Sequence, residues 1–150
     1  MTECYSCRQN AIDPAHLPPR EAIFDDGDWR IAHALSSALS GWVVVVSRRH
    51  ITSLSQLTPR EAAALGPLIK RLSSAVESVT GAVKCYVVFL AEAPGYEHMH
   101  IHVVPRRADM PLDRTGIDAM KYLALPQDEW VPPDEMDEVS ARIRQAMQTG

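Results

Sequence analysis

Long apolar segments are absent from this 150-residue sequence, and so is an apolar leader at its N-terminus. The strongest apolar stretches, around Trp42–Val46 and Tyr86–Ala91, are far shorter than the roughly 20 residues that cross a bilayer as a helix. The first four residues, Met-Thr-Glu-Cys, have neither the basic nor the apolar region of a secretory signal. We therefore expect a cytoplasmic protein with no membrane partner.

Cysteine is scarce, and acidic residues outnumber basic ones. Three cysteines are present, and this odd count, with no sign of secretion, argues against a disulfide framework. The formal net charge of −4 argues against nonspecific binding of nucleic acid. The glycine-rich phosphate loops G-x-x-x-x-G-K-S/T and G-x-G-x-x-G are also missing, so any phosphate chemistry must use other groups.

The remaining composition, 46% hydrophobic and 23% charged residues, fits a single domain over residues 1–150. A hydroxyl N-cap and a capping box predict a helix that begins at Thr58, ends at Gly81 and is kinked at Pro67. Residues 108–130 are poorly patterned and should run over the surface. Strands are predicted at 21–24, 29–34, 42–47, 85–90 and 98–105, and a last helix at 136–147. The fold class is therefore α+β.

Three histidines alternate with apolar residues near the end of this pattern. Side chains alternate between the two faces of a strand, so His98, His100 and His102 should share one face while Met99 and Ile101 turn to the core. Imidazole serves as base, acid, nucleophile or metal ligand near neutral pH. The spacing leaves open a three-histidine metal site or a metal-free catalytic face. The metal site is disfavoured because the outer two positions are about 13 Å apart along a strand.

A C-x-x-C pair, Cys4 and Cys7, stands at the N-terminus. A redox pair of the thioredoxin kind would lie between a strand and a helix, and no strand precedes this one, so metal binding is favoured. Structural zinc needs four ligands, and the candidates for the other two are His16, His33, His50 and the three histidines of the strand. The third cysteine, Cys85, is expected to be a small buried residue of the core.

The segment His98-Met99-His100-Ile101-His102-Val103-Val104 resembles the signature of the histidine triad (HIT) superfamily. Gly41 through His50, a strand closed by two arginines and a histidine, is similar to a second conserved block of the family. The N-terminal C-x-x-C resembles the zinc-containing bacterial type. The resemblance covers residues 4–107 as a core and leaves 108–150 as a C-terminal extension.

This resemblance implies a five-stranded antiparallel sheet with one long central helix, followed here by the C-terminal helix. It implies His100 as the nucleophile and His102 as its partner beside the phosphate, with His98 as the third catalytic histidine. It also implies structural zinc held by Cys4, Cys7, His50 and His98, the first of the triad. Family members are usually dimers, and Val87, Phe89 and part of the long helix are expected to contribute to a two-fold surface.

The sequence departs from the family pattern around the substrate. Trp42 replaces a histidine common in the second block, and it could stack on a base or fill the core, the latter being favoured. Ala34-Leu35-Ser36 offers only a serine where many members contact the ribose. Ala93-Pro94-Gly95 replaces side chains that bind phosphate, which leaves the backbone amides of Gly95 and Tyr96, and Arg106 or Arg107, as possible donors. Trp42, Gly95 and Tyr96 are therefore the candidate substrate-binding residues.

Two functions remain open. The first is a nucleotide hydrolase or transferase that acts at the nucleotidyl α-phosphate through a covalent nucleotidyl-histidine, on a nucleoside phosphoramidate or a dinucleoside polyphosphate. The second is a nucleotide- or metal-binding regulatory module with weak or no catalysis. The intact triad favours the enzyme, and the loss of the usual phosphate-binding side chains favours the module.

Overall fold

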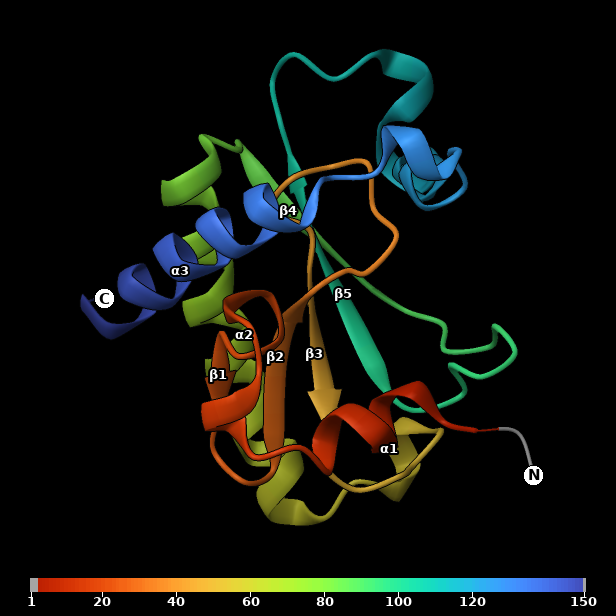
Figure 1. Cartoon of the computed structure of the whole chain (residues 1–150), viewed down its shortest axis with the longest axis vertical. Coiled ribbons are helices and arrows are strands. Elements are labelled where there is room, and N and C mark those ends of the chain that lie inside the picture. The colour runs from red at the N-terminus through yellow and green to blue at the C-terminus, as the bar shows by residue number, and fades with distance from the viewer. Residues whose placement is uncertain (1–2, 150) are drawn as a thin grey trace.

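The computed structural model describes residues 3–149. Its centre is an antiparallel sheet with strand order β1-β2-β3-β5-β4 (Figure 1). The strands are β1 (Phe24–Asp25), β2 (Trp29–His33), β3 (Val43–Ser47), β4 (Lys84–Phe89) and β5 (His100–Arg106). The predicted hairpin is confirmed by the pairing of Phe24 with Ile31. The five-stranded α+β fold is likewise confirmed.

Three α-helices accompany the sheet: α1 (Tyr5–Asn10), α2 (Pro59–Thr80) and α3 (Pro133–Thr149). The predicted capping box opens α2, since the Thr58 hydroxyl accepts from the Glu61 amide while the Glu61 carboxylate accepts from the Thr58 amide. Gly81, with a φ of 73°, ends the helix in the left-handed region. The helix continues through Pro67, which is exposed, so water can satisfy the carbonyl group that the proline leaves without a partner.

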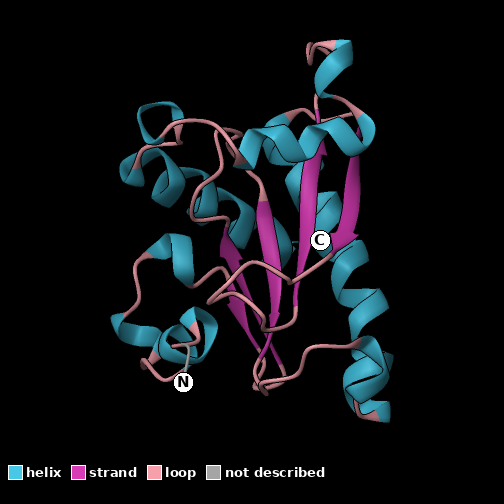
Figure 2. Ribbon diagram, turned by 90° about the vertical axis from the view of Figure 1, so that its right-hand side faces the viewer, coloured by secondary structure: helices cyan, strands magenta, loops and turns pink. Residues whose placement is uncertain are grey.

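The sheet has a different cover on each face (Figure 2). On one face, α2 and α3 bury the main core, to which the strands contribute Ile31, Val45, Ile101 and Val103. On the other face, Trp42 and Val104 form a second cluster with Met110 and Ala119 from the segment after β5. The main core therefore lies on one face of the sheet, and His100 and His102 lie on the other.

The segment after β5 is more ordered than the sequence suggests. It folds into the 3₁₀ helices η4 (Leu112–Arg114), η5 (Gly116–Leu123) and η6 (Gln127–Glu129). The predicted surface excursion is wrong for the residues that pack on Trp42, because Met110 and Ala119 are buried there. Isolated apolar residues in irregular structure have no period by which they could be recognised.

Two predictions about the strands need correction. The run 85–90 was expected to be a buried strand, but β4 is the last strand of the sheet, and Val87 is 50% exposed while Cys85 is half-buried. The histidine strand was expected to close at Pro105, yet β5 continues to Arg106. Proline is tolerated there because β3 pairs with β5 only as far as Val103.

Within residues 3–149, no helix combines the length and apolar character needed to span a membrane.

Candidate functional site

Strand β5 sets the position of the triad. Its pairing with β3 places His100 opposite Val46 and His102 opposite Val44, while Ile101 points to the opposite face and packs in the main core. His98 lies just before the strand and is fully buried. A hydrogen bond fixes the backbone there, because the amide of Met99 donates to the carbonyl of Ile51 at 2.7 Å.

Four of the predicted ligands converge in space. One ligand atom from each of Cys4, Cys7, His50 and His98 lies within 4.8 Å of the others. Nδ1 of His98 is 3.4 Å from Sγ of Cys4 and 3.5 Å from Sγ of Cys7, and 3.2 Å from Nδ1 of His50. A tetrahedral zinc with two sulfur and two nitrogen ligands has edges of about 3.5 Å between sulfur and nitrogen and about 3.3 Å between nitrogens. The donor types and their spacing therefore fit zinc.

The tautomer of His98 also suits a metal. Its Nε2 is 2.6 Å from the carbonyl oxygen of Ser47, and a carbonyl can only accept, so Nε2 carries the hydrogen. The lone pair is then on Nδ1, the atom that faces Cys4, Cys7 and His50. Burial, followed by the neighbouring Cys4, raises the pKa of the Cys7 thiol to about 11. Zinc would thus displace thiol protons when it binds.

The other candidate ligands do not join this cluster. His33 is buried with Nδ1 3.0 Å from the carbonyl of Ala34, and its Nε2 accepts from the amide of Gly41. His16 ends the 3₁₀ helix η1 (Pro14–His16) and is exposed. Among the described residues, His100 and His102 belong to no metal-ligand group. The arrangement therefore favours a single Cys₂His₂ site over a three-histidine site.

His100 is held in one tautomer by its neighbour. Its Nδ1 is 2.7 Å from the carbonyl oxygen of His98, so Nδ1 donates and the lone pair is on Nε2. The ring is half-buried and lines a cavity of about 570 Å³. An unprotonated, accessible Nε2 is the form in which imidazole acts as a nucleophile or base.

His102 has the complementary arrangement. The indole Nε1 of Trp42 donates to Nδ1 of His102 at 3.0 Å, which leaves the hydrogen on Nε2. Burial, and then the charge of His100, lowers the pKa of His102 to about 4. The ring is therefore a neutral donor at physiological pH, and its centroid lies 5.0 Å from that of His100.

Trp42 itself is fully buried and does not line the cavity. Trp42 was expected either to stack on a base or to fill the core, and in the structure it fills the second core cluster. Its ring cannot stack on a substrate from there, and it contacts His102 instead. The family resemblance implied a histidine where Trp42 stands, but the hydrogen bond to His102 depends on the pairing of β3 with β5.

The other candidate substrate contacts differ from expectation. The amide of Gly95 donates to the Glu97 carboxylate at 2.8 Å, and the amide of Tyr96 donates to the carbonyl of Ala93 at 2.9 Å, so neither is free for a phosphate. The Tyr96 side chain, however, lines the cavity. Arg106 and Arg107 do not line it, and Arg107 pairs with Asp109.

Sequence reasoning missed one wall of the cavity. Tyr5, from α1, lines it beside Tyr96, with 5.5 Å between the ring centroids. The Tyr5 hydroxyl donates to Glu21, which also pairs with Arg30 at 2.9 Å, and both charged side chains are buried. Tyr5 stands between the two cysteines, so a metal held by both cysteines would fix α1 and this wall together. Only the C-x-x-C motif pointed to this segment.

The metal centre yields a prediction. Purified protein should contain about one zinc per chain by elemental analysis, and Cys4→Ser should lower that content because it removes one of four ligands. Cys85→Ser is the matched control, since this third cysteine lies outside the cluster. Zinc-free protein whose Cys4 and Cys7 react freely with an alkylating reagent would contradict the assignment. So would loss of zinc on His102→Ala but not on Cys4→Ser.

The contact between Trp42 and His102 yields a second prediction. Trp42→Phe keeps an aromatic ring but removes the indole donor, so His102 should populate both neutral tautomers in long-range ¹H–¹⁵N NMR spectra. Any activity that uses its Nε2 hydrogen should fall about tenfold, the worth of one hydrogen bond. The fall should be uniform above about pH 5, because the buried His102, with its pKa lowered to about 4, remains neutral there.

The control for this variant is Trp29→Phe, another fully buried tryptophan, whose Nε1 donates to the carbonyl of Glu61. Trp29→Phe should leave the tautomer of His102 unchanged. A single Nε2-protonated form of His102 in both variants would show that Trp42 does not set the tautomer.

Comparisons with known proteins agree with this geometry. The family model described as HIT domain matches residues 18–109, more than half of the chain. A search of curated protein sequences found no match. Among solved structures, a zinc-bound histidine triad family protein from Mycobacterium smegmatis aligns at 18% identity and a TM-score of 0.70, over 97% of this chain and 94% of its own.

Two further structures are similar. A hypothetical histidine triad nucleotide-binding protein from Sulfolobus tokodaii aligns at 14% identity and a TM-score of 0.70, over 95% of this chain and 93% of its own. A uridylyltransferase aligns at 23% identity and a TM-score of 0.66, over 98% of this chain and 46% of its own. At these identities the likeness is one of fold, whereas the family model rests on the sequence itself. The chain therefore belongs to the HIT domain family.

Proposed function

We propose that the protein is a nucleotide hydrolase or nucleotidyltransferase that forms a covalent nucleotidyl intermediate on His100. The observation that carries this proposal is the pair of opposite tautomers on one strand face. His100 presents a lone pair at Nε2 because its Nδ1 donates to the His98 carbonyl. His102 presents a hydrogen at Nε2 because its Nδ1 accepts from Trp42. A nucleophile and a neutral donor thus lie side by side at the cavity.

The reaction would proceed in two displacements. In the first, the Nε2 lone pair of His100 attacks the α-phosphorus, a phosphorus–nitrogen bond forms, and the leaving group departs with the electron pair of the broken bond and takes a proton from solvent. The Nε2 hydrogen of His102 would stabilise the charge on the phosphoryl oxygens. In the second, water or an acceptor attacks the phosphorus and forms a phosphorus–oxygen bond, the phosphorus–nitrogen bond breaks with its electron pair returning to Nε2 of His100, and the proton of the attacking group passes to solvent. The His98 carbonyl keeps the proton on Nδ1 of His100 throughout.

The cavity supports a nucleotide as the substrate. His100 and His102 line it, together with apolar side chains that include Leu90, Met120 and Trp130. Tyr5 and Tyr96 add two aromatic rings at the wall. Aromatic and apolar walls suit a nucleobase, and the histidines suit the phosphate. Nucleoside phosphoramidates and dinucleoside polyphosphates are the proposed substrate classes.

A regulatory binding module is the second candidate, and one observation favours it. Arg30 is the only arginine or lysine among the residues that line the cavity, and it is paired with Glu21. The backbone amides of Gly95 and Tyr96 are also engaged. The charge of a phosphate would therefore be met chiefly by the histidines, which weakens transition-state stabilisation relative to a site rich in donors.

The catalytic proposal is tested at His100. His100→Ala should abolish turnover of a panel of nucleoside phosphoramidates and dinucleoside polyphosphates while zinc content stays unchanged, because His100 is outside the metal cluster. His102→Ala should cost about 10²–10³-fold, as loss of one transition-state donor does. Rapid quench with substrate, followed by mass spectrometry, should find an acid-sensitive nucleotidyl adduct on the peptide that contains His100.

The exposed His16 supplies a control, since His16→Ala should retain both turnover and adduct. Turnover that survives His100→Ala would overturn the covalent route. Nucleotide binding without turnover in the wild-type protein would favour the binding module.

We also propose that the protein forms a two-fold dimer through β4. This strand lies at the edge of the sheet and exposes Val87, whereas the neighbouring Phe89 is partly buried against the core. Val87→Asp should therefore convert a dimer to a monomer in sedimentation velocity experiments at micromolar concentration. The control is Ile117→Asp, which places the same charge at an exposed apolar residue of η5. A wild-type protein that sediments as a monomer at this concentration would contradict the dimer proposal.

A further inference from the structure

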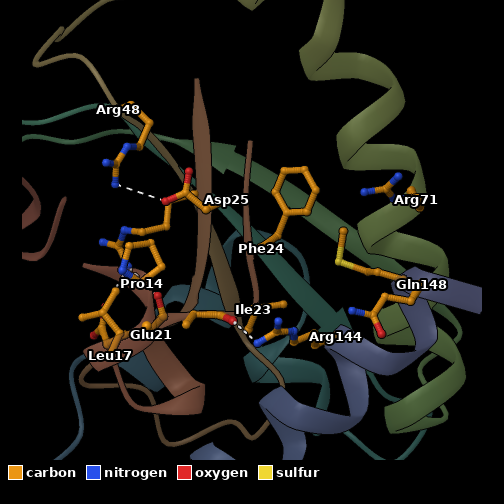
Figure 3. Close-up of a pocket in the computed structure, with 14 residues that line it drawn as sticks. Pro14, Leu17, Glu21, Ile23, Phe24, Asp25, Arg48, Arg71, Arg144 and Gln148 are labelled. Atoms are coloured by element: carbon orange, nitrogen blue, oxygen red, sulfur yellow. Dashed lines mark hydrogen bonds and ion pairs between the residues drawn. The ribbon is translucent and has the colours of Figure 1, made fainter. Parts of the chain in front are cut away.

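A second cleft, of about 830 Å³, follows the β1 edge of the sheet (Figure 3). Its apolar floor contains Ile23, Phe24 and Met147, which belong to the core under α2 and α3 or pack against it. No histidine of the triad lines this cleft. It adjoins the histidine cavity only at the buried pair of Glu21 and Arg30, which lines both. It is therefore a separate space.

Arginines dominate the charged lining of this cleft. Four arginines, at positions 30, 48, 71 and 144, face two carboxylates, Glu21 and Asp25. Arg30 is neutralised by Glu21 at 2.9 Å, and Arg48 lies 3.2 Å from Asp25. Within residues 3–149, no carboxylate lies within 4.0 Å of the guanidinium of Arg71 or Arg144. The cleft thus carries an excess of positive charge in a chain whose net charge is −4.

The guanidinium groups keep donors available. Arg71 places its central carbon 5.3 Å from the ring centroid of Phe24, a stacking contact that leaves the N–H groups at its edge free. Arg144 makes one long contact, 3.5 Å from Nη1 to the carbonyl of Ala22. Nη1 of Arg48 is buried without a hydrogen-bond partner, although Asp25 is near.

We propose that this cleft binds a small organic phosphate ester. Arg71, from α2, and Arg144, from α3, would supply the positive charge that attracts the phosphate dianion, and a planar guanidinium group pairs with phosphate oxygens through two parallel hydrogen bonds. The organic part would lie on Phe24 and Met147, where apolar surface is open. Figure 3 shows Arg71 on the α2 side of Phe24, Arg144 below Phe24 toward Ile23, and Arg48 beside Asp25 on the opposite side.

The test uses phenyl phosphate as the probe and the full-length, zinc-loaded His100→Ala variant, in which the proposed covalent chemistry is removed. Phenyl phosphate should shift the backbone amide resonances of Ile23, Phe24 and Gln148 in ¹H–¹⁵N NMR spectra. Adding Arg71→Ala and Arg144→Ala together should weaken its affinity by about tenfold or more, because each arginine supplies charge-assisted hydrogen bonds. Inorganic phosphate and phenol should each bind more weakly than the ester.

Arg142→Ala is the matched control, because Arg142 is an exposed arginine of α3 that does not line the cleft. It should leave the affinity unchanged. Equal weakening by Arg142→Ala would reduce the effect to bulk charge and overturn the site. So would shifts confined to Ala91–Ala93 and His102 at the histidine cavity, or inorganic phosphate that binds as tightly as the ester. If the double change unfolds the protein, Arg71→Gln alone gives the same comparison.

Discussion

The hydrogen bonds made by the ring and the carbonyl group of His98 are the constraint on which the rest of the site depends. Its ring donates from Nε2 to Ser47, so Nδ1 is free for the metal cluster. Its carbonyl accepts from His100 and thereby sets the tautomer of the proposed nucleophile. One residue thus joins the end of β3, the metal-ligand cluster and the face that carries His100 and His102. A displacement of His98 would disturb all three together.

Helix α1 links the metal-ligand cluster to the cavity that His100 lines. Cys4 caps this helix and Cys7 lies in its first turn, so a metal held by both fixes a helix of six residues that has little intrinsic stability. Tyr5 follows Cys4 and forms a wall of the cavity beside Tyr96. A zinc that is structural by its ligand set therefore also shapes the site where the substrate is proposed to bind.

Trp42, at the position where the family resemblance implied a histidine, has two roles in the structure. The indole fills the second core cluster with Met110 and Ala119, and its single donor is used on His102. Indole nitrogen can only donate, so it leaves no choice of tautomer for the imidazole that it contacts. The segment after β5 contributes to this arrangement because it buries the other side of the tryptophan.

The sequence alone determined the elements with strong local signals. The Thr58 capping box, the alternation around His100 and the C-x-x-C pair predicted α2, the histidine face and two metal ligands, since each depends on short-range spacing. Only the tertiary structure decided the features that depend on distant segments. These are the exposure of β4, the engagement of the Gly95 amide, the hydrogen bond from Trp42 and the contact of Arg71 with Phe24. Strand order and helix packing bring those residues together, and no local pattern encodes which face a neighbour will cover.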